Sequence, residues 1–141
     1  MERLSASPMD EPTLTVRAPG AEPTALDRQA WAAQPGAGRD IGELVPGRRG
    51  SAAPLEPVVH GQDPSCTHVH LASRDGSFHA SLTREQARVG WVVYGLDDGP
   101  LPAEFGGPFR LFFPGVDACA NLKDAASITF ATAPGHDTRP R

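Results

Sequence analysis

Several short runs of the chain alternate between apolar and polar residues, which is the pattern of strands with one buried face. The clearest are CTHVHLAS and FHASL, which are separated by an Asp75–Gly76 turn signal of the kind that closes hairpins. The apolar run WVVYGL instead predicts a buried strand. The predicted strands are Thr13–Arg17, Ile41–Val45, Cys66–Ser73, Phe78–Leu82, Trp91–Leu96, Phe109–Phe113 and Ala125–Ala131.

Helices are predicted only as short segments between these strands. Either Thr24 or Asp27 can cap the first of them, and Trp31 on its apolar stripe is most simply a core anchor. A capping-box pair, Thr83 with Gln86, begins the last one. The predicted helices are a segment that ends at Ala33, Leu55–His60 and Thr83–Arg88.

The composition agrees with many short elements, because 15 glycines and 15 prolines in 141 residues leave little room for long helices. We therefore expect an α+β fold with a mixed, largely antiparallel β-sheet and short helices. The length suits one domain. We place this domain at residues 13–131, between a disordered lead-in at 1–12 and a disordered tail at 132–141.

The densest apolar run lies within Leu101–Lys123 and is bounded by residues that end a strand on both sides. Gly106, Gly107 and Pro108 precede it, and Pro114 and Gly115 follow it. Two cations, Arg110 and Lys123, belong to this unit. A short strand that presents cations beside glycine-lined backbone suits an anionic ligand, so this segment is where we expect the functional site.

Two further arginines, Arg48 and Arg49, lie in a tight glycine-rich loop, PGRRG, at Pro46–Gly50. Their guanidinium groups can contact an anion, and arginine pairs beside glycines are equally common in solvated turns. The net charge of −4 and the absence of a basic run argue against nucleic-acid binding. No apolar run is long enough for a membrane span and no signal-peptide pattern opens the chain, so a cytoplasmic protein is expected.

The cysteines and histidines give no defined metal motif. Cys66 and Cys119 are isolated from each other and lack the CxxC spacing of zinc sites, which favours free thiols. His68 and His70 share one face of the predicted strand and can meet one metal ion. They also fit the polar face of a half-exposed strand, since no third ligand is nearby in the sequence.

The segment YGLDDGPLPAEFGGPFRLFFPGVDACANLK resembles the oxidoreductase molybdopterin-binding domain of the sulfite oxidase family. The matching positions are Asp98–Leu101, Gly106, Pro108, Arg110, Pro114, Gly115 and Lys123, and the hairpin SRDGSFHASL matches further upstream. The resemblance implies a molybdopterin cofactor, with its pterin phosphate bound by Arg110 and its pterin approached by Lys123. Gly106, Gly107, Arg48 and Arg49 are then further candidates for cofactor binding. An active member would transfer an oxygen atom at molybdenum in a two-electron reaction.

Two departures from the family pattern limit what the resemblance implies. The family's histidine five residues before the arginine is Phe105 here, and the segment Ile41–Leu55 contains no cysteine to ligate molybdenum. Cys119 is the remote option for a thiolate. The sequence therefore predicts a domain that binds the pterin phosphate without normal molybdenum catalysis. The alternative is a protein-interaction module in which a groove lined by Phe105 and Phe109 docks a partner.

Overall fold

A computed structural model describes residues 11–116, 121–135, 137 and 138. In chain order its helical elements are α1 (Arg28–Ala32), η2 (Ile41–Glu43), α2 (Glu56–His60), α3 (Arg84–Ala87) and η3 (Ala103–Phe105). Its strands are β1 (Leu14–Arg17), β2 (Thr24–Leu26), β3 (Arg39–Asp40), β4 (Ser51–Pro54), β5 (His68–Ser73), β6 (His79–Thr83), β7 (Trp91–Leu96), β8 (Gly99–Pro100), β9 (Arg110–Phe112) and β10 (Ala125–Ala131).

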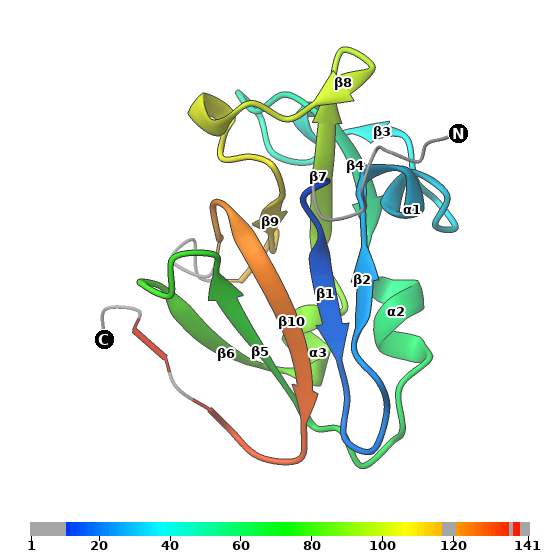
Figure 1. Cartoon of the computed structure of the whole chain (residues 1–141), viewed down its shortest axis with the longest axis vertical. Helices are drawn as coiled ribbons and strands as arrows, with labels where there is room; N and C mark the ends of the chain where they lie inside the picture. Colours follow the sequence, from blue (N-terminus) through cyan, green and yellow to red (C-terminus); the bar gives the residue numbers. More distant parts are fainter. Residues whose placement is uncertain (1–10, 117–120, 136, 139–141) are drawn as a thin grey trace, which may run out of the picture.

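Two sheets carry these strands (Figure 1). The first has the order β2-β1-β10-β5-β6, and it is mixed because β1 runs parallel to β10 whereas its other pairs are antiparallel. The second has the order β3-β4-β7-β8, with β9 also paired to β7, and all its pairs are antiparallel. The predicted α+β fold with a mixed, largely antiparallel sheet and short helices is therefore confirmed.

Two clusters of buried side chains lie on opposite faces of the second sheet. In β7, Val92 and Tyr94 belong to the larger cluster, whereas Val93 belongs to the smaller one. In β9, Leu111 packs into the larger cluster and Phe112 into the smaller one. Because side chains alternate along a strand, β7 and β9 are buried on both faces, which explains their nearly uninterrupted apolar sequences.

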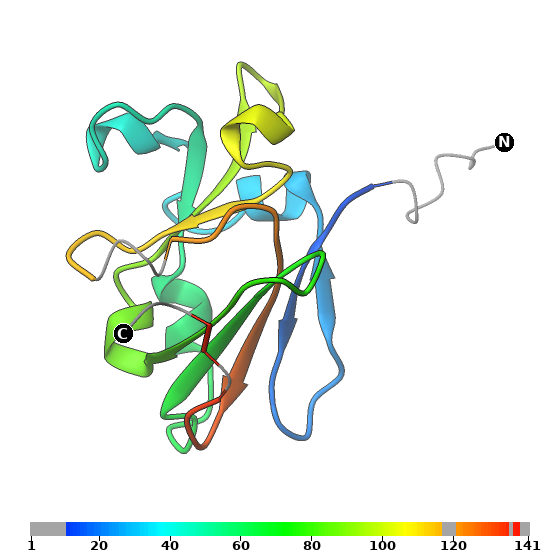
Figure 2. The ribbon, with the colours of Figure 1, turned by 90° about the vertical axis from the view of Figure 1, so that its left-hand side faces the viewer.

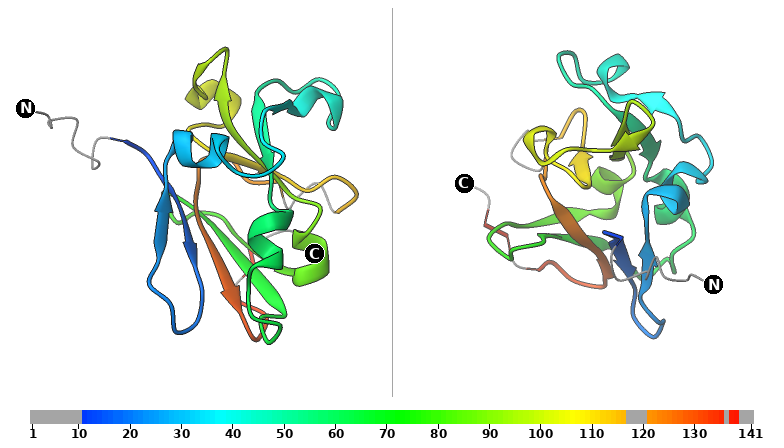
Figure 3. Two further views of the ribbon diagram at one scale, coloured as in Figure 1. Left: turned by 90° about the vertical axis from the view of Figure 1, so that its right-hand side faces the viewer. Right: turned by 45° about the horizontal axis from the view of Figure 1, so that its top comes forward.

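The short helices are anchored to the sheets by specific side chains. Asp27 caps α1 by accepting a hydrogen bond from the Ala30 amide, and Trp31 is fully buried as predicted. The capping box of Thr83 and Gln86 is formed at α3. Figure 3 shows α2 and α3 side by side (left view), where they contact each other. Arg84 joins them, since its guanidinium donates to the carbonyl oxygens of Val59, Gln62, Asp63 and Cys66 at 2.7–3.1 Å.

The predicted strand at Ile41–Val45 was wrong. The segment forms η2, whose first turn is capped by the Asp40 carboxylate through the Gly42 amide. Ile41 is fully buried in the smaller cluster, and Leu44 and Val45 pack against it. Spacings of three and four residues place these side chains on one face of a helical turn. The strand of this region is instead β4, which pairs with β7.

Residues after β10 make hydrogen bonds to the β5–β6 hairpin. The Ala133 carbonyl lies 2.9 Å from Nε2 of His70, and the Gly135 amide donates to Oγ of Ser81. Thr138 donates its amide to the His79 carbonyl. This part of the predicted tail therefore runs along the outer face and free edge of the hairpin. No helix among the described residues is long and apolar enough to cross a membrane.

Candidate functional site

Arg110 lies on β9 and points into the smaller cluster, on the same side of the strand as Phe112. Its guanidinium carbon is 4.6 Å from the centroid of the Phe112 ring, and its Nη1 donates to the Phe105 carbonyl at 3.3 Å. The residue is only 9% exposed, and Nε is buried with no hydrogen-bond partner in the described structure. Burial, with the like charge of Arg48 beside it, lowers the pKa of the Arg110 guanidinium.

Three cations meet at one cavity of about 460 Å³. Arg48 comes from the loop before β4, Arg110 from β9, and Lys123 from the segment that leads into β10. Neither the Arg48 guanidinium nor the Lys123 ammonium has a hydrogen bond or an ion pair with any residue that the structure describes. Arg48 also lies over Phe112, 5.8 Å from the ring centroid, so this ring is flanked by two guanidinium groups. We call this the cation cavity. Its wall also carries the carboxylates of Asp75 and Asp124, of which Asp124 is paired with Arg74, so the three cations outnumber the acidic groups.

A smaller cavity of about 250 Å³ adjoins Arg110 as well. Arg48 and Arg49 both line it, together with Phe105 and Glu104. Arg49 differs from Arg48 because it pairs with Asp97 at 3.4 Å and its guanidinium carbon lies 5.9 Å from the Phe105 ring. Arg49 does not line the larger cation cavity. The structure thus separates the two predicted loop arginines, and only Arg48 joins both Arg110 and Lys123.

Gly106 provides the space in which the side chains of Arg110 and Lys123 lie. A Cβ atom on it would be 2.7 Å from Cδ of Arg110 and 3.2 Å from Cγ of Lys123, and its φ is +91°. The Gly106 carbonyl also accepts a hydrogen bond from the Asp124 amide at 2.8 Å, which fixes the segment carrying Lys123. A Cβ added to Gly107 would instead collide with the Leu101 carbonyl. Of the two predicted glycines, Gly106 is the one beside Arg110 and Lys123.

Replacing Gly106 with alanine is expected to weaken anion binding more than it weakens the fold. The new methyl group must displace the side chains of Arg110 and Lys123, and the left-handed backbone adds about 1 kcal/mol of strain. Gly20→Ala is the matched control, because Gly20 has φ +72° and nothing within 4 Å of its added Cβ. Gly20→Ala should show the loss of stability from backbone strain alone in urea unfolding, and Gly106→Ala a larger loss because two side chains are displaced. Only Gly106→Ala should lose affinity for a phosphate monoester in calorimetry. Equal phosphate affinity of the two variants would contradict this role.

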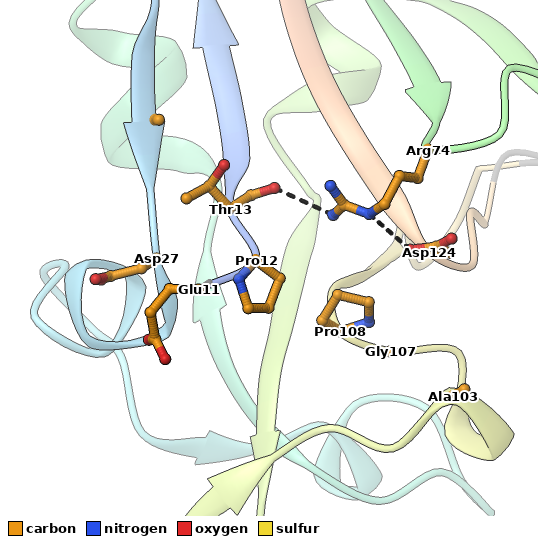
Figure 4. A pocket seen from close by; sticks show the side chains of 10 residues that line it. Glu11, Pro12, Thr13, Asp27, Arg74, Ala103, Gly107, Pro108 and Asp124 are labelled. Atoms are coloured by element: carbon orange, nitrogen blue, oxygen red, sulfur yellow. Dashed lines mark hydrogen bonds and ion pairs between the residues drawn. The ribbon is translucent and has the colours of Figure 1, made fainter. Parts of the chain in front are cut away.

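A third cavity, of about 1000 Å³, is wider and more open (Figure 4). It shares Asp124 with the cation cavity of about 460 Å³. Arg74 is the one cation among its described lining residues, and it is already paired: Nε lies 3.1 Å from the Asp124 carboxylate, and Nη2 donates to the carbonyls of Thr13 and Ala125. Glu11 and Asp27 add negative charge to its wall. This cavity is therefore unsuited to an anion, although it is larger.

The remaining candidates do not join the cation cavity. Cys66 is 2% exposed and belongs to the larger core cluster, and Cys119 lies outside the described residues. His68 and His70 do share the half-buried face of β5, but His68 contacts Oγ1 of Thr67 and His70 the Ala133 carbonyl. No group of three or more potential metal ligands occurs in the described parts of the chain. Phe109 is 1% exposed in the larger cluster, so it does not form a groove with Phe105, which packs on the smaller one.

The cavity also has lining residues that sequence reasoning did not select: Ser73, Asp75, Ser77, Phe78, Asn121, Leu122 and Asp124. The first four belong to the β5–β6 turn, which the sequence predicted only as a hairpin closure. The antiparallel pairing of Ala125 with Ser73 brings this turn beside the segment that carries Lys123, as Figure 2 also shows. No local signal could have revealed this proximity, because it depends on the register of two strands about fifty residues apart.

Comparison with protein families supports what this geometry suggests. Residues 51–138 match the model of the oxidoreductase molybdopterin binding domain, and this range contains every lining residue of the cation cavity except Arg48. No significant match to a curated protein was found. The family model covers well over half of the chain and confirms the resemblance that the Leu101–Lys123 segment carries. The chain therefore belongs to the oxidoreductase molybdopterin-binding domain family.

Proposed function

We propose that this domain binds the phosphate of a molybdopterin-type cofactor with Arg48, Arg110 and Lys123. The observation that carries the proposal is Arg110, whose guanidinium is nine-tenths buried and faces a cavity with two further cations. Among the described residues, its Nε has no hydrogen-bond partner and the other two cations have no ion-pair partner. A buried polar group without a partner costs free energy, and a phosphate supplies the charge-assisted acceptors that this site lacks. The donor set therefore fits the phosphate end of the cofactor.

The described residues do not fit the metal end equally well. Molybdenum in this family is bound through a cysteine thiolate, a soft ligand, and no cysteine lines the cation cavity in the described structure. Cys66 is enclosed in the core, which leaves Cys119, outside the described residues, as the remote option. When bound, the cofactor supplies oxygen-atom transfer at molybdenum. Our proposal is that this chain holds the pterin phosphate without carrying out that reaction in the normal way.

Cofactor content tests this proposal directly. The protein purified from a host that makes molybdopterin should retain pterin in near-stoichiometric amount, measured by fluorescence after oxidative release, and much less molybdenum, measured by mass spectrometry. Lys123→Gln should bind the pterin phosphate with about a tenfold higher Kd, the effect of one charge-assisted hydrogen bond, and should therefore retain less pterin on purification. Arg17→Gln is the matched control, because Arg17 is an exposed cation on β1 that does not line the cavity.

Two outcomes of this experiment, and one of a separate partner-binding measurement on Arg110→Glu, would contradict the proposal. A wild-type protein that carries no pterin and binds no pterin phosphate would remove the binding function. Stoichiometric molybdenum with oxygen-atom transfer would remove the non-catalytic part. Retention of a protein partner by Arg110→Glu with its fold intact would favour the interaction module, although the separation of Phe105 and Phe109 into different clusters does not support a shared docking groove.

A further inference from the structure

The outer edge of β6 is covered by residues that follow β10. β6 is the end strand of the first sheet, next to β5 (Figure 1). Three of its backbone amides point away from β5 and donate to side-chain oxygens: His79 to Thr138 at 3.0 Å, Ser81 to Asp137 at 3.1 Å and Thr83 to Gln86 at 2.9 Å. Two of these three acceptors come from the segment after β10. We call its residues 133–135, 137 and 138 the edge cover.

Gly135 leads the edge cover to β6 by lying directly against the imidazole ring of His70. A Cβ atom on Gly135 would be 2.5–2.6 Å from three atoms of this ring. The Ala133 carbonyl lies 2.9 Å from Nε2 of the same ring, and the Gly135 amide donates to Oγ of Ser81 at 3.0 Å. The path of the edge cover therefore requires a residue without a side chain at position 135.

Polar contacts at the surface hold the edge cover in place. The hydrogen bonds that Thr138 exchanges with His79 are exposed, as is the contact of Ala133 with His70. None of the described residues of the edge cover belongs to either buried cluster. Since hydrogen bonds at the surface compete with water and contribute little net stability, the edge cover can leave β6 without any change in the core.

β6 itself has none of the usual protection against pairing with another strand. An uncovered edge pairs readily with an extended chain, and lysine or proline on the edge is a common way of preventing this. The sequence of β6, His-Ala-Ser-Leu-Thr, contains neither lysine nor proline. The edge cover is therefore what keeps the amides of His79 and Ser81 from another strand.

The outward-facing residues of β6 are arranged symmetrically about Ser81. Hydrogen-bonded pairs in an antiparallel ladder occur at every second residue, which is the spacing of His79, Ser81 and Thr83. A twofold axis at Ser81 therefore places Ser81 opposite the same residue of a second copy, and His79 opposite Thr83. None of the three is an acidic residue, a lysine or an arginine, so no fixed like charges oppose this pairing. A second copy of the chain thus fits the edge without any further change in sequence.

We propose that the β6 edge is a self-association surface, where two copies of the chain pair edge to edge, and that the edge cover holds the protein in its monomeric form. Such a contact is isologous, because both copies use the same residues. Each copy must release its own cover before pairing, so the apparent dimerisation constant depends on the square of the uncovered fraction. The contact lies outside the cation cavity and does not depend on the proposed function.

Gly135→Val in the full chain tests this proposal, because a valine side chain does not fit against His70 and displaces the edge cover. Sedimentation velocity at several protein concentrations should give a dimerisation Kd at least about tenfold lower than that of the wild-type protein. Ala21→Val is the matched control, since Ala21 is exposed between β1 and β2, far along the chain from the edge cover. Hydrogen exchange of the His79 and Ser81 amides, measured by NMR, should be faster in dilute Gly135→Val than in the wild-type protein and should slow again as the variant dimerises.

A second substitution identifies the surface that dimerises. Ser81→Pro, added to Gly135→Val, removes the amide at the centre of the pairing. This amide donates to Asp137 and not to β5, and proline is tolerated where a strand's N–H points outward, so the double variant should fold and remain monomeric. Ser81→Lys keeps the backbone amide and adds a charge at the edge, and it replaces Ser81→Pro if the proline variant does not fold.

Three results would overturn the proposal. A Gly135→Val protein that stays monomeric although its His79 and Ser81 amides exchange rapidly would show that the uncovered edge does not self-associate. Slow exchange of these amides in the dilute monomeric variant would show that the edge cover is not what protects them. A dimer that persists with both Ser81→Pro and Ser81→Lys would place the contact on another surface.

Discussion

Replacing Arg110 with methionine is expected to make the ligand-free domain more stable and to weaken its affinity for phosphate strongly. Removing the guanidinium relieves a desolvated charge and an unsatisfied Nε. The losses are the contact with Phe112 and the hydrogen bond to the Phe105 carbonyl, each about 1 kcal/mol. Methionine keeps most of the apolar volume. We expect a net gain of about 1 kcal/mol in the free energy of unfolding.

The affinity of Arg110→Met for phosphate should fall, whereas its stability rises. Loss of a charge-assisted donor pair to phosphate costs about 3 kcal/mol, or roughly 100-fold in affinity. Urea unfolding with and without a phosphate monoester measures both effects on one sample, because a ligand that binds only the folded state raises its stability. Arg49→Met is the matched control, since Arg49 pairs with Asp97 and does not line the cation cavity. A destabilised Arg110→Met protein that still binds phosphate would show that Arg110 is a structural residue.

Replacing Arg84 with methionine is expected to lower the stability of the domain strongly and leave its binding unchanged. The two terminal nitrogens of the Arg84 guanidinium donate hydrogen bonds to four carbonyl oxygens of one chain segment. Two of these carbonyls belong to the buried residues Val59 and Cys66. Loss of the guanidinium leaves the carbonyls of Gln62 and Cys66 without a donor among the described residues, whereas those of Val59 and Asp63 each keep a backbone amide donor. We expect a loss of about 3 kcal/mol, which corresponds to a decrease of roughly 10 °C in Tm for a domain of this size.

Arg88→Met provides the comparison for this prediction. Arg88 also carries a guanidinium in the same region, but its partners Glu56 and Glu85 are carboxylates at the surface. Exposed ion pairs contribute little to stability, so the Tm of Arg88→Met should stay close to the wild-type value. The two variants can be compared by thermal unfolding monitored by circular dichroism. Similar Tm values for Arg84→Met and Arg88→Met would contradict the proposed role of Arg84.

The sequence predicted the elements that have a clear local pattern of side chains. The β5–β6 hairpin has clear alternation and a turn dipeptide, and β7 and β10 have the predicted bounds. β4 was missed because its sequence, Ser-Ala-Ala-Pro, has neither β-branched nor aromatic residues. Its small side chains allow Ala52 and Ala53 to be buried on opposite faces, in the two core clusters. Pairing with β7 makes this segment a strand, and tertiary pairing is invisible to local propensity.

The site was predictable to the same extent. Arg110 and Lys123 follow from one contiguous segment and a family resemblance, so the sequence could name them as candidates, and the structure places both at one cavity. Arg48 could be nominated but not chosen over Arg49, since both occupy one loop and only packing separates them. Asp75 was read as a turn residue, which it is. Asp75 also lines the cation cavity, because β10 lies next to β5. No local sequence pattern encodes that position.

The place of β10 in the first sheet has a consequence for the order in which the protein acquires its structure. β10 is the central strand, between β1 and β5, although it is the last strand of the chain. A growing polypeptide can form the β5–β6 hairpin early, but the sheet stays divided until residues 125–131 have been synthesised. Joining β1 to β10 closes more than a hundred residues, and such distant pairings slow folding. The β5–β6 turn and Lys123 meet only at that step, so a nascent chain has no complete cation cavity before residues 125–131 have been synthesised.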